Sequence, residues 1–218
     1  MPRTPLKIVD GICMDLAQMM RERGLALKEH AFIMDAEPGL RASVSLSPLP
    51  AERLDVSLQV HIDEVSDLGY RQPDGHLQVH LGRGGPSVFG QNSHYSLEPW
   101  PLSRRSTASI ADVLIHIGIP ALTIIASRDW ILQNWKAHWL PARDRVTSAS
   151  SGLEALKRKK GFVGFLPFIT PPYVVAAAIL HGFGENDRAR RLLREKADEI
   201  ETLHSSHAQS LRDLASRL

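Results

Sequence analysis

Hydrophobic and polar residues alternate most regularly between Arg53 and Val65. The apolar positions of this stretch are Leu54, Val56, Leu58, Val60 and Ile62. The polar positions between them are Asp55, Ser57, Gln59, His61 and Asp63. A period of two over this length is typical of a β-strand with one buried face and one wet face. Because every apolar residue is large, we expect this strand to lie inside a sheet rather than at its edge.

Neighbouring segments show the same alternation. Between Leu40 and Ser47, apolar residues alternate with three serines, and between His76 and Gly82 three apolar residues alternate with Gln78 and His80. His30 to Ala36 is a possible further strand. Turn-forming residues separate these segments at Glu37-Pro38-Gly39 and Pro73-Asp74-Gly75, and Pro48 to Pro50 is a connector. The pattern predicts a small antiparallel sheet of three to five strands, whose apolar face must be covered by helices.

A helix is expected on the N-terminal side of the sheet. Apolar residues from Leu6 to Met20 recur at steps of three and four over residues 5–23, and Gly24 follows them. After residue 107 helical signals dominate. Ser109 and Asp112 form a capping box for a helix over 110–117 that ends at Gly118, and Pro120 opens the next helix.

The C-terminal part is predicted to form an αα-hairpin. Thr170 is expected to cap a helix over 173–181, and after a break between Gly182 and Asn186 one long charged helix runs to the C-terminus. The fold class is therefore α+β in a single domain over residues 1–218. Residues 1–107 form one helix and the sheet, and residues 108–218 form a helical half.

The last helix carries apolar residues at alternating four- and three-residue steps, the spacing of a coiled-coil seam. The seam residues are Leu193, Ala197, Ile200, His204, His207, Leu211, Leu214 and Leu218. Such a seam could form a homodimer that protonation of its two histidines weakens. The alternative is an ordinary helix packed within its own chain.

Composition excludes several classes of function. The chain has 218 residues with 26 basic and 24 acidic side chains, a formal charge of +2 that favours neither nucleic acid nor a membrane surface. Its single cysteine, Cys13, excludes an internal disulfide and fits a buried thiol. The apolar run from Val174 to Leu180 is too short to span a bilayer. We therefore expect a soluble, cytoplasmic protein that does not bind membranes.

The polar face of the predicted sheet is the first place to look for chemistry. It carries Asp55, Gln59, His61, Asp63 and His80. Two imidazoles and a carboxylate (His61, His80 and Asp63) could form a zinc set, and the alternative is that they are ordinary solvated residues. Gly82 to Gly85 lacks the order of a nucleotide-binding loop, and the sequence contains neither a Gly-x-Ser-x-Gly nor a His-Glu-x-x-His motif. No cofactor is expected.

Two arginine-containing segments are candidates for binding. Arg188, Arg190, Arg191 and Arg194 lie among acidic residues, which favours surface ion pairs over nucleic-acid binding. Residues 83–107 combine glycines and prolines with aromatic and arginine side chains, the types enriched at interface hot spots. These candidate partner-binding residues are Phe89, His94, Tyr95, Trp100, Arg104 and Arg105. The two adjacent arginines suit a partner with an acidic surface, whereas the alternative is that the aromatic residues hold the segment against the core.

The order of elements also resembles a family of uncharacterised bacterial domains encoded near polymorphic toxins, some of which are taken to be immunity proteins. The resemblance rests on Leu54 to Ile62, on Gly118 to Leu122, and on Gly184 to Asp187 with the following Ala189 and Leu192-Leu193. It implies a protein-binding module that blocks a toxin or effector, and it supplies no catalytic residues. Two alternatives stay open: a small-ligand or metal-dependent enzyme that uses the polar sheet face, and a nucleic-acid-associated defence protein.

Overall fold

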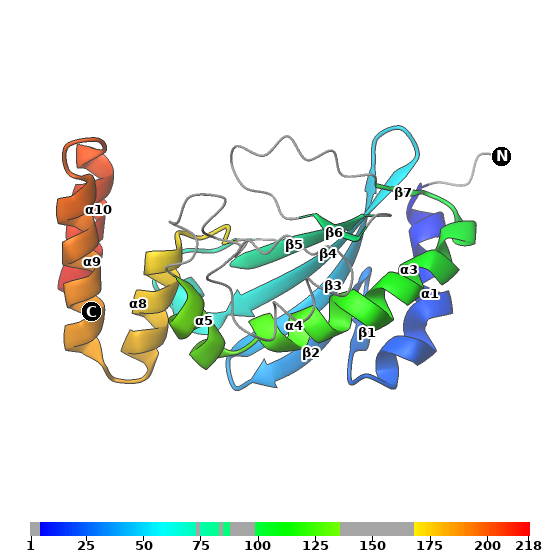
Figure 1. Ribbon diagram of the computed structural model, residues 1–218, viewed down its shortest axis with the longest axis horizontal. Helices are drawn as coiled ribbons and strands as arrows, with labels where there is room; N and C mark the ends of the chain where they lie inside the picture. The colour runs from blue at the N-terminus through cyan, green and yellow to red at the C-terminus, as the bar shows by residue number, and fades with distance from the viewer. Residues whose placement is uncertain (1–4, 73–74, 83–84, 88–98, 136–167) are drawn as a thin grey trace.

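The computed structural model describes residues 5–72, 75–82, 85–87, 99–135 and 168–218. Helix α1 (Pro5–Arg21) precedes an antiparallel sheet, and the rest of the described chain is mostly helical (Figure 1). The predicted α+β class, with one helix before the sheet and a helical C-terminal half, is confirmed. Cys13 is buried in α1, and Gly24 adopts the positive φ of a glycine placed after a helix.

Seven described strands form the sheet. They are β1 (Ala26–Lys28), β2 (Ala31–Glu37), β3 (Leu40–Leu49), β4 (Arg53–Ile62), β5 (Leu77–Gly82), β6 (Gly85–Ser87) and β7 (Trp100–Pro101). Strands β1 to β6 follow one another in space, and β7 pairs with the start of β4. The sheet exceeds the predicted three to five strands because β1, β6 and β7 have only three or two residues each, too few to show a period.

The predicted central strand lies inside the sheet as β4, between β3 and β5. All five residues of its apolar face are at most 1% exposed. It ends at Ile62 rather than Val65, because residues 63–67 form the short helix α2 (Asp63–Asp67). Pro48 and Leu49 belong to β3 rather than to a connector, since they pair with the first residues of β4.

Gly75 shows why one predicted turn needs glycine. Its φ of +81° is in the left-handed region, and a Cβ at this position would lie 2.7 Å from the Val60 carbonyl oxygen. The backbone N–H of the next residue, His76, donates to the same oxygen at 2.7 Å. Glycine therefore lets the chain approach β4 closely as β5 begins.

Helical residues run without interruption from Arg104 to Ile125. A 3₁₀ turn (Arg104–Ser106) leads into α3 (Thr107–Val113), a π-helical turn (Leu114–Gly118) and α4 (Ile119–Ile125). The predicted cap at Ser109, end at Gly118 and new start at Pro120 are therefore wrong. Pro120 lacks an N–H, and the π-helical turn before it accommodates the missing hydrogen bond. Gly118 provides close packing, since a Cβ there would lie 3.0 Å from Leu81 Cδ1.

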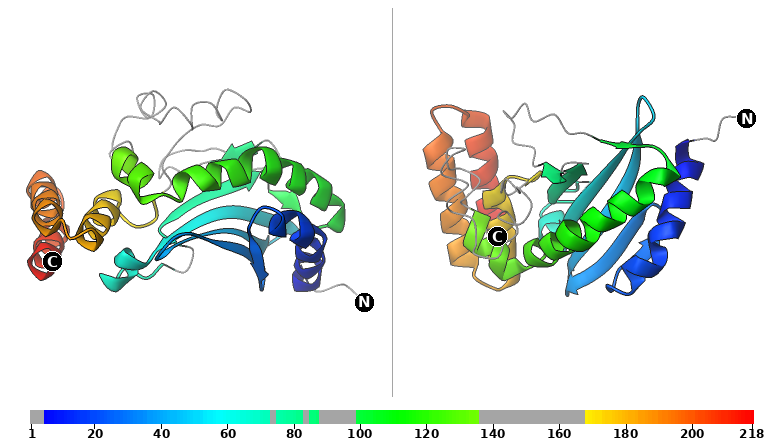
Figure 2. Two further views of the ribbon diagram at one scale, coloured as in Figure 1. Left: turned by 90° about the horizontal axis from the view of Figure 1, so that it is seen from below. Right: turned by 45° about the vertical axis from the view of Figure 1, so that its right-hand side comes forward.

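This long helix lies across the apolar face of the sheet beside α1 (Figure 2). By length and composition it is the one helix of the described residues that is apolar enough to cross a membrane. Half of its most apolar window is buried in this fold, and the core helix of a soluble protein passes the same test. Its packing on β3 and β4 is that of a core helix.

The helices α5 (Arg128–Asn134), α8 (Pro172–Gly182), α9 (Asn186–Ile200) and α10 (Ser205–Arg217) stand at one end of the sheet (Figure 1). Helix α8 is apolar all round and separates two hydrophobic cores. Val175, Ala178 and Ile179 join the core of the sheet. Tyr173, Val174, Ala177 and Leu180 join a second core with α9 and α10.

The long C-terminal helix predicted from the sequence is instead a pair of helices. The chain leaves the helix after Ile200 and turns back before α10. The apolar residues of the predicted seam, from Leu193 to Leu218, are buried in the second core of the same chain, except Ile200, which is partly buried against it. The coiled-coil prediction is therefore wrong, because its apolar stripe folds back on itself. A homodimer stays a prediction, without support from this stripe.

Candidate functional site

The polar face of the sheet is built by cross-strand rows of polar side chains on β3, β4 and β5. Residues directly opposite one another are Arg41 and His61, then Ser43, Gln59 and Gln78, then Ser45, Ser57 and His80, then Ser47 and Asp55. The helices α1, α3 and α4 lie on the other side, and no helix of the described residues lies across this face (Figure 2).

Hydrogen bonds connect the rows. Ser43 Oγ donates to Gln59 Oε1 at 3.4 Å, and Gln59 Nε2 donates to Ser57 Oγ at 3.2 Å. Asp55 Oδ1 lies 2.9 Å from His80 Nδ1. Three of the predicted face residues (Asp55, Gln59 and His80) therefore do lie together on neighbouring strands.

The proposed zinc set is not assembled. His80 lies opposite Ser57, four residues along β4 from His61, and it bonds Asp55. Asp63 Oδ1 instead accepts a hydrogen bond of 2.9 Å from Arg41 Nη2. Within the described ranges, no three His, Cys, Asp or Glu side chains are grouped so that they could hold a metal ion. The hypothesis that His61, Asp63 and His80 bind one zinc ion is wrong.

His61 belongs to a different cluster, which sequence reasoning missed. Its Nε2 lies 3.0 Å from Ser66 Oγ, and His76 Nε2 lies 3.3 Å from the same oxygen. His76 Nδ1 lies 2.8 Å from Thr170 Oγ1. The two imidazole rings lie 4.9 Å apart between their centroids. His76 and Thr170 are fully buried, whereas His61 and Ser66 are half-buried.

Four segments bring this cluster together at one end of the sheet. Helix α2 carries Ser66 past the end of β4, and the tight turn at Gly75 places His76 beside β4. The His76 carbonyl accepts a 2.9 Å hydrogen bond from the Ile169 N–H, which holds Thr170 against the imidazole. Thr170 therefore does not cap α8 as predicted. The N-cap of that helix is Pro171, and the Thr170 hydroxyl forms a hydrogen bond with His76 instead.

Both imidazoles are neutral at pH 7. Burial lowers the pKa of His76 to about 4, and the neighbouring His61 adds to the effect. Burial also lowers the pKa of His61, with a further contribution from the charge of Arg41. A neutral imidazole offers one donor and one acceptor. Thr170, His76, Ser66 and His61 can therefore form one continuous chain of hydrogen bonds.

The buried neutral state of His76 predicts a pH dependence of stability. Below pH 6.5 the unfolded chain takes up a proton at His76, whereas the folded chain does so only near pH 4. Stability is therefore lost as pH falls through this window. Because of His76, we expect the free energy of unfolding to be about 2 kcal/mol lower at about pH 5 than at about pH 7.5. Urea unfolding of the wild type and of His76→Gln at both pH values measures this contribution. An equal loss in the two proteins would contradict it.

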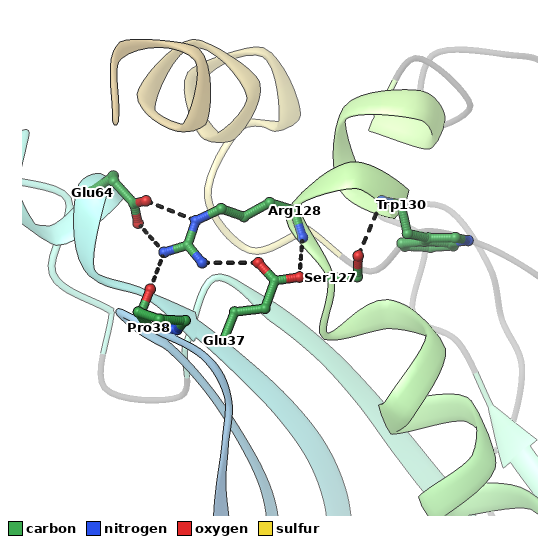
Figure 3. A network of polar contacts seen from close by, with 6 residues as sticks. All are labelled: Glu37, Pro38, Glu64, Ser127, Arg128 and Trp130. Carbon is green, nitrogen blue, oxygen red and sulfur yellow. Dashed lines mark hydrogen bonds and ion pairs between the residues drawn. The ribbon is translucent and has the colours of Figure 1, made fainter. Parts of the chain in front are cut away.

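A second polar cluster fixes helix α2 in place (Figure 3). Arg128 donates from Nε and Nη2 to the two Glu64 oxygens at 2.7 and 2.9 Å, from Nη1 to Glu37 at 3.0 Å, and from Nη2 to the Pro38 carbonyl at 2.8 Å. Burial alone would lower the pKa of Arg128, but these hydrogen bonds raise it. The guanidinium thus ties α5 to the β2–β3 turn and to the helix that carries Ser66.

The predicted partner-binding segment is only partly described. Phe89, His94 and Tyr95 lie outside the described residues. Trp100 is 3% exposed and donates from Nε1 to the Leu81 carbonyl at 3.1 Å, so for this residue the structure favours the core alternative. Arg104 Nε donates to Asp15 Oδ2 of α1 at 2.9 Å. The neighbouring Arg105 is exposed.

Two of the four arginines of α9 make surface ion pairs of the predicted kind. Arg188 Nη1 lies 2.5 Å from Glu185 Oε2, and Arg190 Nη1 lies 3.3 Å from Asp187 Oδ1. These pairs partly neutralise the helix, which weakens the nucleic-acid alternative.

Comparison of the chain with protein-family models, with curated proteins and with solved structures gives no match. The function must therefore be inferred from the residues and geometry of this chain.

Proposed function

We propose that the protein is a binding module that blocks a protein partner, of the immunity or inhibitor type. The observation that carries this proposal is the polar face of β3, β4 and β5, which no described helix covers (Figure 2). A soluble domain usually packs helices on a face that serves only its own core. Ser57 at the centre of this face is buried, whereas Ser43 and Ser45 are half-buried and Ser47 is exposed, so the β3 side of the face is a surface that a partner can reach.

The composition of this face suits a specific interface. Serine and glutamine side chains dominate its central rows, so donors and acceptors lie close to the backbone and a partner can approach closely. Ionisable groups are few there, and Asp55 Oδ1 lies 2.9 Å from His80 Nδ1. The centre of a protein interface is likewise depleted of charged residues. Because paired strands hold these side chains, little conformational entropy is lost on binding.

An acidic partner remains part of the proposal. Arg41 at the end of the polar face is paired with Asp63, whereas Arg105 is exposed before α3. Arg104 is engaged by Asp15, so Arg105 is the better candidate of the two adjacent arginines for a partner carboxylate. The immunity or inhibitor role itself rests on the family resemblance of the sequence.

A bulky substitution at the centre of the face tests the proposal. Ser45→Arg places a long side chain among the short ones of β3 and β4, and we expect it to weaken partner binding by about 2 kcal/mol. Ser206→Arg introduces the same residue on the exposed surface of α10 and should leave binding unchanged. The partner is first isolated by affinity purification from the native host, and its affinity for each variant is then measured by titration calorimetry.

Thermal melts accompany each titration, because a variant that unfolds would lose binding for another reason. We expect both variants to melt within a few degrees of the wild type, as surface substitutions do. Tight binding by a folded Ser45→Arg variant would exclude the polar face as the interface. If the purified partner is a nucleic acid whose affinity falls steeply with salt, the nucleic-acid alternative holds instead.

A further inference from the structure

We propose that Ser66 is an activated nucleophile that cleaves carboxylic esters, with His61 as its general base. The geometry carries this inference, because an imidazole nitrogen lies 3.0 Å from the Ser66 hydroxyl oxygen. A serine activated by a base requires such a hydrogen bond. Both side chains are half-buried, so they combine a constrained geometry with access from solvent.

In one of its two tautomers, the second imidazole directs the serine hydroxyl toward His61. When the Thr170 hydroxyl donates to His76 Nδ1, the N–H of His76 lies on Nε2 and donates to Ser66 Oγ. The single hydroxyl proton of Ser66 then points to His61 Nε2. His76 is a positioning residue in this arrangement, because it acts through Ser66 and is itself fully buried.

The surrounding fold holds the nucleophile in place. Ser66 lies on α2, and Glu64 of the same short helix accepts two hydrogen bonds from Arg128 (Figure 3). Thr170 is held by the backbone contact between Ile169 and His76. Sites supported by such surrounding contacts keep their reacting groups in a fixed geometry.

Arg41 and Asp63 balance each other's charge beside the site. Arg41 lies directly opposite His61 on β3, and its Nη2 donates to Asp63 Oδ1 at 2.9 Å. Because the guanidinium is already paired with a carboxylate, it does not select the charge of a substrate. We therefore assign the site to carboxylic esters as a class.

The reaction proceeds in two balanced steps. Ser66 Oγ bonds to the acyl carbon while its proton passes to His61 Nε2, and the ester C–O bond breaks as that proton moves to the departing alcohol. Water then attacks the acyl-serine and gives a proton to His61, which returns it to Ser66 Oγ as the carboxylic acid leaves. The net reaction is hydrolysis of one ester bond by one water.

A fluorophosphonate probe tests the nucleophile without knowledge of the natural ester. Attack by Ser66 forms an oxygen–phosphorus bond, releases fluoride and adds the probe mass to the full-length chain. Intact mass spectrometry and peptide mapping should locate a single adduct at Ser66. Ser66→Ala should remain unlabelled, whereas Ser206→Ala, on the exposed surface of α10, should be labelled at the wild-type rate.

The dependence of the labelling rate on pH distinguishes the role of His61 from that of His76. His61→Gln should lower the labelling rate about 100-fold and abolish its dependence on pH near neutrality. His76→Gln should lower the rate but keep the midpoint of the profile, because that midpoint belongs to His61. A wild-type midpoint below the ordinary histidine value is expected, since burial lowers the pKa of His61.

Cysteine substitution provides a second test that does not depend on Ser66→Ala being folded. Cys13 is buried and burial raises its pKa to about 11, so the wild-type chain should react slowly with iodoacetamide at pH 7. Ser66→Cys should react faster than Ser206→Cys, although position 206 is the more exposed. Equal or slower alkylation at position 66, or a wild-type chain that acquires no fluorophosphonate adduct, overturns the proposal.

Discussion

Val60→Asp is expected to leave the protein largely unfolded. Val60 is fully buried on the apolar side of β4, where the core offers a carboxylate no hydrogen-bonding or charged partner in place of water. Burying such a group costs about 4 kcal/mol or more, a large share of the stability of a typical domain. Circular dichroism and urea unfolding of the purified variant measure the loss.

The adjacent residue supplies the matched control. Gln59→Asp introduces the same carboxylate on the opposite face of β4, where the Ser43 and Ser57 hydroxyls can donate to it. We expect a change of about 1 kcal/mol or less for this variant. A Val60→Asp protein with a wild-type melting temperature would show that the face assignment of β4 is incorrect.

Arg128→Met is expected to have the second largest effect. The Arg128 side chain is 7% exposed, and its removal leaves the Glu37 and Glu64 carboxylates close together without their shared cation. Breaking a buried ion pair by removing one partner costs about 3 kcal/mol or more. Urea unfolding should show this loss, and because Glu64 lies on α2, hydrogen exchange should accelerate around Ser66.

The variant Arg41→Met is the control that shows whether burial of an arginine, and not only its charge, determines the loss of stability. Arg41 also bonds a carboxylate, Asp63, but both side chains are about half-exposed. An exposed pair contributes about 0 to 1 kcal/mol, so this variant should unfold close to the wild type. Equal losses in the two variants would mean that burial of the Arg128 guanidinium has no particular role in stability.

The strands that sequence reasoning predicted are those with a local signal. In β3 and β4 successive side chains point to opposite faces of the sheet. The alternation of apolar and polar residues from Ala42 to Ile62 therefore shows which face each residue occupies, without knowledge of the partner strands. In the helical half, predictions of helix ends were wrong at positions where the tertiary fold overrides the local preference of the residues. Gly118 and Pro120 suggest an interruption, but packing on the sheet keeps the helix continuous through a π-helical turn.

The turn before α10 was missed for the opposite reason. Glu201 to His204 contains neither glycine nor proline, and the apolar spacing continues through it. The alternating spacing is the same whether the stripe faces a second chain or folds back on its own. Only the packing of Leu193 with Leu211 and Leu214 in one core distinguishes the two.

The candidate site could be predicted only in part. Asp55, Gln59 and His80 share the polar face because of the strand period, which is local. Whether His61 lies beside His80 or beside His76 depends on strand register and on the path of the turn at Gly75, which the sequence does not specify. Thr170 is 94 positions from His76, and only the tertiary fold brings their side chains together.

The position of α8 between two cores has a consequence for synthesis of the protein on the ribosome. The sheet and its helices precede α8 in the chain, so they can assemble while α9 and α10 are still being made. During that interval Val174, Ala177 and Leu180 lack the cover of α9 and α10, although they are fully or almost fully buried in the finished protein. The nascent chain therefore exposes part of an apolar helix until α9 and α10 emerge, and this is the period in which a chaperone would bind it.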